Sequence, residues 1–402
     1  MGAASDATNV EYELGEVPQI DLLRRLIVGK FLELLDVPVM RKWYFPAGHL
    51  AMLSPSGDQD WATFEQMSAT MELMKELASP YTIYLTASSQ PISAEQFKTL
   101  SEAGIEFALH PDFMAGQLFS ETELAGQLKK VMADTGGKIL GQRPHCCRWE
   151  TCDQLPAWSE KVGLQYESML GLKLWDDKPA KSGYWVGTGL PYNMIDTQHY
   201  RRMDFLQIPV YTCDNLDFWK PDGSTLTYKP GGRPLKLSGL GLSEEEMFQM
   251  SKRIMDLAMG KYHSAYGYIW HPHYLAAGTL NHPINRTDTH FRNTVNYAKS
   301  LGMGLIGNNA LNEFWRAREG VSLRDVAWNS ESSTADYVLS GDVKIDSLTL
   351  MAPLGFKEKK ARISVNGSPR EYTEANVLGG HYAMFTVDAH PEEELLISVT
   401  YE

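Results

Sequence analysis

Residues able to bind a metal ion or to move a proton follow four separate apolar runs of this 402-residue chain. They are Asp58 and Asp60 after the first run, then His110, then Arg143-Pro144-His145, and finally His271. A single histidine beside a strand is more often a hydrogen-bonded structural residue than a ligand. Repetition of the pattern in four places instead indicates strands that each deliver polar side chains to one shared edge.

The first of these groups predicts a metal site. Alternation along an extended chain points Asp58 and Asp60 to the same side, where their repulsion is relieved by a cation or by a shared proton. We therefore expect one divalent metal ion held by Asp60, His110 and His145, although either aspartate fits the ligand role. Zinc suits this set best, with cobalt, nickel, iron or manganese as alternatives, and such an ion activates a water molecule at neutral pH.

The remaining residues of the pattern suit acid and base roles. Asp58 is expected to act as the general base, and Arg143 to pair with it and keep it ionised. His271 would face them as the general acid that protonates a leaving amine, and His273 could exchange roles with it. A nearby carboxylate would raise the pKa of His271.

Two of the candidate substrate-binding residues come from the stretch 171–204, which is rich in Gly, Trp, Tyr and Pro and shows no clear period. This stretch is long for a barrel loop, so it is either a binding lid or an insertion. Aromatic faces there would pack on sugar rings, and packing in a satellite core is the competing explanation. The residues assigned to substrate binding are Trp185, Tyr192, Trp270 and His273.

The elements that would position these residues alternate between strand-like and helix-like patterns. Strands are expected to end near 54, 87, 110 and 143, with helices around 63–77, 94–103 and 121–134. Further strands are expected at 164–170, 206–213, 265–270 and 304–306, with helices at 243–259 and 290–301. This order implies an α/β fold with parallel strands, a β/α barrel of seven or eight strands whose chemistry lies at the strand C-termini.

The chain changes character near residues 321–333. Short alternating runs separated by turn residues such as Asn366-Gly367 predict a small antiparallel β domain, sandwich-like, over 333–402. Before the barrel, periodic apolar residues at 20–40 predict an amphipathic helix. We therefore divide the chain into an N-terminal helical extension (1–43), a barrel (44–320) and the C-terminal β domain.

Composition excludes several classes of partner. A net charge of -13 argues against non-specific binding to nucleic acid or to anionic membranes. No apolar stretch is long enough to be inserted in a bilayer, and the polar N-terminus lacks the features of a signal peptide. The four cysteines have neither zinc-type spacing nor the density of a disulfide framework, which favours reduced thiols. We expect a soluble protein, cytoplasmic unless an upstream segment is missing, and the oligomeric state stays open.

The order of these motifs resembles that of the polysaccharide deacetylase family, the NodB-homology group similar to carbohydrate esterase family 4. The similarity covers about residues 44–318. Ser56-Gly57-Asp58-Gln59-Asp60 is similar to the first family motif, in which one aspartate is the base and the next acidic residue binds the metal. His110-Pro111, Arg143-Pro144 and His271-Pro272 are similar to the second, third and fifth motifs. The resemblance implies a distorted (β/α)7 barrel that removes acetyl groups from N-acetylated sugars.

Departures at three motifs mark a divergent member, and the third motif, usually Arg-x-Pro, here runs Arg143-Pro144-His145. The second family motif has two histidines separated by three residues, whereas only His110 is present here, with Asp112 nearby. We infer that His145 replaces the missing histidine as a metal ligand. The fourth motif is ambiguous, since Glu167 and Asp214 both fit its place, and either would serve as the carboxylate beside the general acid.

The sequence thus predicts a metal-dependent hydrolase that removes an N-acyl group, such as acetyl, from a carbohydrate or from an N-acylated small molecule. One alternative keeps the metal but directs it to a non-sugar amide or imide bond. Another alternative, from a different class, is an inactive barrel that binds carbohydrate without a metal.

Overall fold

The computed structural model describes residues 16–88, 91–113, 118–148, 153–169, 183–184, 186–221, 227–228, 235–236, 239–276 and 287–402. Contacts divide the chain into two compact units. The first contains the residues up to Pro18 together with Met52–Leu257 and Ser264–Asn312. The second contains Gln19–Ala51, Ala258–His263 and Glu313–Glu402, so the segment Gln19–Ala51 groups with the C-terminal strands.

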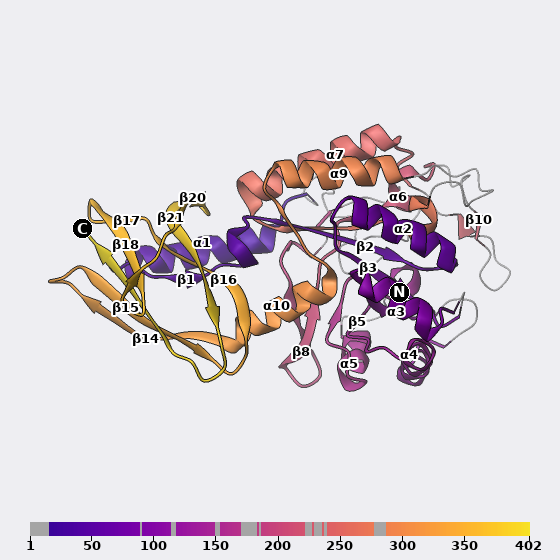
Figure 1. Ribbon diagram of the computed structural model, residues 1–402, viewed down its shortest axis with the longest axis horizontal. Helices are drawn as coiled ribbons and strands as arrows, with labels where there is room; N and C mark the ends of the chain where they lie inside the picture. Colours follow the sequence, from indigo (N-terminus) through magenta and orange to yellow (C-terminus); the bar gives the residue numbers. More distant parts are fainter. Residues whose placement is uncertain are drawn as a thin grey trace. The chain divides into compact units, whose positions relative to one another are not determined.

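A mainly parallel sheet forms the centre of the first unit (Figure 1). Its strand order is β7-β8-β6-β5-β4-β3-β2-β12-β9, with β13 paired to β2, and the pair β7 and β8 is antiparallel. The bounds are β2 (Met52–Asp58), β3 (Tyr81–Leu85), β4 (Ile105–Leu109), β5 (Gly141–Gln142), β6 (Tyr166–Glu167), β7 (Tyr192–Asp196), β8 (Arg201–Gln207), β9 (Thr212–Cys213), β12 (Ala265–Ile269) and β13 (Gly304–Leu305). A separate hairpin pairs β10 (Thr227–Tyr228) with β11 (Leu235–Lys236).

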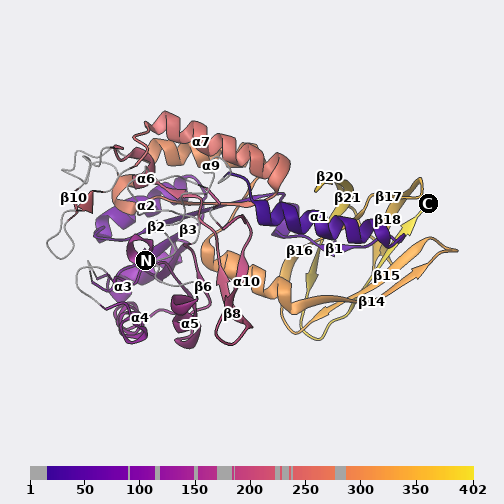
Figure 2. The same ribbon diagram turned by 180° about the vertical axis from the view of Figure 1, so that it is seen from behind.

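Helices connect these strands, and α7 and α9 pack side by side (Figures 1 and 2). The bounds are α2 (Phe64–Glu76), α3 (Ala94–Glu102), α4 (Glu121–Thr135), the 3-10 turn η4 (His145–Cys147), α5 (Gln154–Lys161), α6 (Asp214–Phe218), α7 (Glu244–Leu257), α8 (Pro272–Leu275) and α9 (Asp288–Ser300). A capping box of Thr63 and Gln66 starts α2, because each side chain accepts a backbone N–H of the other residue. This cap leaves only the short segment 59–63 between β2 and its helix.

The second unit contains two antiparallel sheets, ordered β1-β16-β21-β20 and β14-β15-β22-β18-β17, with β19 paired to β18. Its elements are α1 (Gln19–Leu34), β1 (Arg41–Lys42), η3 (Pro46–Gly48), the π-helical turn η6 (Ala258–Tyr262), β14 (Val321–Asn329), β15 (Thr334–Gly341), β16 (Ile345–Pro353), β17 (Gly355–Phe356), β18 (Lys359–Val365), β19 (Ser368–Pro369), β20 (Thr373–Val377), β21 (Gly380–Ala389) and β22 (Leu395–Tyr401). Leu339 and Ile397 of one sheet and Leu350 and Phe385 of the other share one buried core, as in a sandwich. The chain passes from the first unit into this one within α10 (Asn308–Gly320).

The α/β class with parallel strands, followed by antiparallel strands at the C-terminus, is confirmed. Closure into a barrel of seven or eight strands stays a prediction, because the described strands pair in a series that runs from β7 to β9. The expected strand at 206–213 divides into the end of β8 and the separate β9. In the stretch 171–204, the described part contains the strand β7, which the sequence pattern did not indicate. Among the described helices, none is both long and apolar enough to cross a membrane.

Candidate active site

Parallel pairing brings the ends of β2, β4, β5 and β12 to one edge of the sheet in the first unit. The register of β12 on β2 places His271 next to Asp58, and the register of β4 on β5 places His110 next to Arg143. All four side chains are buried. The shared edge that the sequence pattern predicts is therefore present.

Gly57 permits the close approach of β2 and β12 at this edge. A Cβ atom added there would lie 1.9 Å from the carbonyl oxygen of Trp270 and 2.0 Å from the hydroxyl oxygen of Tyr81. The Tyr81 hydroxyl donates a hydrogen bond to that same carbonyl. A side chain at residue 57 would therefore separate the strand ends and move His271 away from Asp58.

Asp60, His110 and His145 form a group suited to a divalent metal ion. One ligand atom from each of them lies within 4.8 Å of the others. The Asp60 Oδ1 atom is 3.2 Å from His110 Nε2 and 3.7 Å from His145 Nε2. Ligand atoms held about 2.1 Å from a tetrahedral cation are roughly 3.4 Å apart, so the spacing fits a metal such as zinc.

Hydrogen bonds to the far side of each imidazole strengthen this fit. His110 Nδ1 is 2.5 Å from the carbonyl oxygen of Arg143, and His145 Nδ1 is 3.1 Å from Asp112 Oδ1. Both partners are acceptors, so each Nδ1 carries the proton and donates it. With Nδ1 bound to an acceptor on its far side, each ring presents Nε2 to the Asp60 carboxylate. An imidazole oriented in this way by an acceptor at its other nitrogen is typical of histidine ligands in metal sites.

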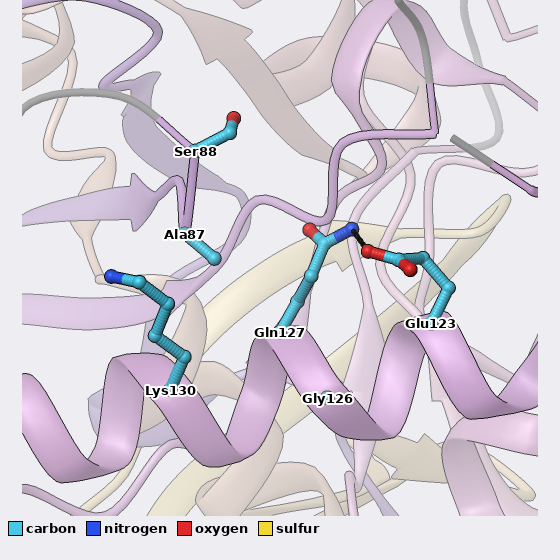
Figure 3. Close-up of a pocket in the computed structure, with 6 residues that line it drawn as sticks. All are labelled: Ala87, Ser88, Glu123, Gly126, Gln127 and Lys130. Atoms are coloured by element: carbon cyan, nitrogen blue, oxygen red, sulfur yellow. Dashed lines mark hydrogen bonds between the residues drawn. The ribbon is translucent and has the colours of Figure 1, made fainter. Parts of the chain in front are cut away.

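Asp112 is itself held by Gln127 of α4, a residue that lines a surface pocket of about 190 Å³ (Figure 3). The Gln127 side chain accepts the Asp112 backbone N–H and donates to the Asp112 carbonyl, both at 2.7 Å. Gln127 also donates to Glu123 at 2.8 Å, as the dashed line in Figure 3 shows. Ser88, which lines the pocket from the segment after β3, donates to Asp112 Oδ2 at 3.2 Å. These bonds fix the carboxylate that orients His145.

Replacing Asp112 with Asn is expected to weaken zinc affinity by about 10- to 100-fold, the usual cost of losing a charged partner of a histidine ligand. The bonds from Gln127 go to the backbone of residue 112, so this variant keeps them and the local fold. Competition against a chromophoric chelator measures the affinity. An unchanged affinity would contradict the orienting role. The control is Asp134→Asn, because Asp134 pairs with the exposed Lys130 on the same helix.

A fully buried arginine, Arg143, stabilises the ionised form of Asp58. Arg143 donates to Asp58 Oδ1 at 2.7 Å, to Ser56 Oγ at 2.9 Å and to the Ser168 carbonyl at 2.7 Å. Its guanidinium also lies 4.0 Å from the centre of the Tyr84 ring. Burial alone would raise the pKa of Asp58, but Arg143, His110 and His271 together outweigh burial and hold this pKa below its ordinary value. The other oxygen, Oδ2, remains directed toward the imidazoles of His110 and His271, at 3.9 Å from each Nε2.

His271 is oriented by Asp214, the first residue of α6. Asp214 Oδ1 accepts from His271 Nδ1 at 2.6 Å, and Oδ2 accepts the His271 backbone N–H at 2.8 Å. Burial lowers the pKa of His271, but the carboxylates of Asp214, Asp60 and Asp58 together outweigh this effect, and the pKa rises to about 9. Glu167, the other carboxylate considered from the sequence, instead accepts from Gln142, and burial raises its pKa to about 8.

The described members of the expected substrate-binding set differ in their burial. Trp185 lies outside the described residues. The assignment of Trp270 to substrate binding is corrected. Its side chain is fully buried, stacks on Tyr268 and donates to His290, so it has no free face for a substrate. Tyr192 is half-buried in β7, at the far end of the strand order from β12. His273 is buried beside His271, with the two ring centres 5.3 Å apart.

No family model matches the chain, and no curated protein matches it. Solved structures similar to it include a protein from Mycobacterium smegmatis provisionally assigned as a polysaccharide deacetylase, with 16% identity, a TM-score of 0.49, and coverage of 70% of this chain and 94% of that one. Puue allantoinase has 12% identity, a TM-score of 0.47, and coverage of 69% and 94%. A CE4 family pseudoenzyme from Bacillus anthracis has 13% identity, a TM-score of 0.36, and coverage of 67% and 66%. Because all three identities are 16% or lower and all three TM-scores are below 0.5, we infer activity and substrate from the residues of the site.

Proposed function

We propose that this protein is a metal-dependent hydrolase that removes an acyl group from the nitrogen of an N-acylated sugar. The observation that carries the proposal is the convergence of His110 Nε2 and His145 Nε2 on the Asp60 carboxylate, with both Nδ1 atoms committed to oxygen acceptors. Asp58 and His271 lie beside this group. Asp58 accepts from the cation Arg143, and His271 contacts the carboxylate of Asp214. A metal site next to a carboxylate and a histidine is an arrangement for hydrolysis.

Asp60, His110 and His145 would hold the metal ion, which supplies a Lewis acid that lowers the pKa of water and polarises a carbonyl oxygen. Asp58 accepts a proton from the attacking water at Oδ2, because Oδ1 is occupied by Arg143. His271 donates a proton from Nε2 to the leaving nitrogen, since Asp214 occupies its Nδ1. Arg143 and Asp214 thus keep the base ionised and the acid protonated at the same pH.

The choice of an N-acylated sugar follows the motif resemblance of Ser56–Asp60, His110, Arg143 and His271. The proposal therefore separates into a metal, a bond type and a substrate class, and each has its own observable. Elemental analysis reports the metal. Release of acetate reports the bond that is broken, and a panel of substrates with and without a sugar reports the class.

We expect the purified protein to contain about one zinc or other divalent ion per chain and to release acetate from N-acetylglucosamine oligomers. Removing the metal with a chelator should stop the release, and adding it back should restore it. Release from a cyclic imide or a simple acetamide, with none from the oligomers, would favour the alternative with a non-sugar substrate. Protein that contains metal but hydrolyses neither substrate would contradict the enzymatic function.

A further inference from the structure

Trp61 is an exposed aromatic residue that directly follows the metal-ligand candidate Asp60. Its exposed fraction is 47%, whereas those of Asp60, His271 and His273 are 9%, 4% and 2%. Trp combines a large apolar face with an N–H group, and it is enriched at recognition surfaces where one end of the ring is packed and the other is accessible. None of the motifs that suggested the function includes this residue.

The segment that carries Trp61 is firmly anchored. The Ala62 N–H donates to the Gln59 carbonyl at 2.7 Å, which closes a tight turn with Asp60 and Trp61 at its centre. Gln59 in turn donates its N–H to Tyr84 of β3 at 2.9 Å, and its side chain accepts the Thr86 N–H at 3.0 Å. Asp60 has a φ of 48°, in the left-handed region that aspartate tolerates better than most residues. The Trp61 backbone is therefore fixed relative to the carboxylate of Asp60.

The Trp61 ring continues a row of rings that leads into the site. It lies 5.3 Å from the ring centre of His273 at an angle of 34°, and His273 lies 5.3 Å from the ring centre of His271. The inner part of the indole is thus supported by protein, and the exposed part is available to a ligand. A ring that packed on this part would lie alongside the proposed acid and metal ligand.

Arg143 is not available to bind a charged group of the substrate. It is fully buried and already donates to Asp58, Ser56 and Ser168. Its guanidinium is therefore committed and does not serve an anionic substrate. A pyranose ring has apolar C–H groups on one face, which pack on an aromatic face without requiring a charge partner.

We propose that Trp61 is a specificity-determining residue that packs against the pyranose ring of the substrate. This inference rests on the hydrolase function proposed above and names the part of the chain that distinguishes a sugar from other acylated amines. The indole positions the ring through contact with its C–H face. The acyl nitrogen on that ring is then directed toward Asp58 and His271.

The test compares Trp61→Ala and Trp61→Phe on a tetramer of N-acetylglucosamine and on 4-nitrophenyl acetate, which has no sugar ring. We expect Trp61→Ala to lower kcat/KM on the tetramer about tenfold or more, chiefly through KM, and by a much larger factor than on the ester. Trp61→Phe keeps an aromatic face and should recover most of the loss. Tyr200→Ala is the matched control, because Tyr200 is 90% exposed and has no part in the site.

Equal losses on both substrates, or no loss on the tetramer, would overturn the inference. Binding of the tetramer, measured by calorimetry on the intact protein, separates this result from failure of the proposed function. A parent protein that binds the tetramer but hydrolyses nothing would refute the proposed function. Weaker binding by Trp61→Ala would then still support packing of Trp61 on the sugar ring. Tetramer binding that Trp61→Ala leaves unchanged would refute this packing, whether or not the parent is active.

Discussion

Replacing His145 with Ala is expected to lower zinc affinity by more than about 100-fold, because removal of a ligand should cost more than removal of a ligand's hydrogen-bond partner. His145 is only partly buried, in the turn η4, so the substitution leaves a small space at the surface and not a cavity in the core. Zinc content after dialysis and competition with a chelator both measure the change. Circular dichroism should show an intact fold.

His199→Ala is the matched control for this experiment. His199 also has its Nδ1 against a carboxylate, that of Asp196 at 2.8 Å, but its side chain is 72% exposed and away from the cluster. This variant should retain zinc like the parent. If His145→Ala retained full zinc occupancy as well, the inferred replacement of the missing family histidine would be wrong, and Asp112 would become the better candidate for the third ligand.

Replacing His271 with Ala is expected to reduce the hydrolysis rate by about 10²- to 10⁴-fold, the usual contribution of a positioned general acid. Asp214 holds the imidazole at Nδ1, and Nε2 is 3.9 Å from Asp58 Oδ2, on the side where the base acts. Because His271 is not among the three residues of the metal group, its loss should leave zinc content unchanged. Steady-state kinetics and elemental analysis on the same preparation measure both quantities.

A comparison with Asp58→Asn tests whether acid and base act as a pair. Asn keeps the size of Asp58 and still accepts from Arg143, so the metal and the fold should be retained while most of the rate is lost. A double variant should then be little worse than the more damaging single one, since groups that act together are not additive. Loss of zinc from His271→Ala would instead make His271 a ligand and leave His273 as the remaining candidate acid.

The positions of the site residues could be predicted because each follows an apolar run. Parallel strands place their ends at one edge, so Asp58, His110, Arg143 and His271 had to meet if the strands were adjacent. The pairing of Arg143 with Asp58 followed from the same logic, since a buried guanidinium needs an anion. Their roles stay predictions that the variants above examine.

Other features depended on strand register and on packing, which the residue pattern does not contain. Glu167 and Asp214 both follow apolar residues, and only the pairing of β9 with β12 places Asp214 beside His271. Trp270 could have been excluded from the substrate surface, because neighbours along a strand point to opposite sides and His271 already faces the site. Trp61 gave no periodic signal, and its importance follows from exposure next to buried polar groups.

The interleaved second unit has a consequence for synthesis of the protein. The Met40 N–H donates to the Tyr337 hydroxyl, 297 residues further along the chain, and β1 pairs with β16. At about 5–20 residues per second, the ribosome needs roughly 15–60 s between making these two segments. During that interval the early segment has no partner strand and is exposed to chaperones and proteases. A C-terminal truncation that removed β16 would therefore also leave β1 without its partner strand.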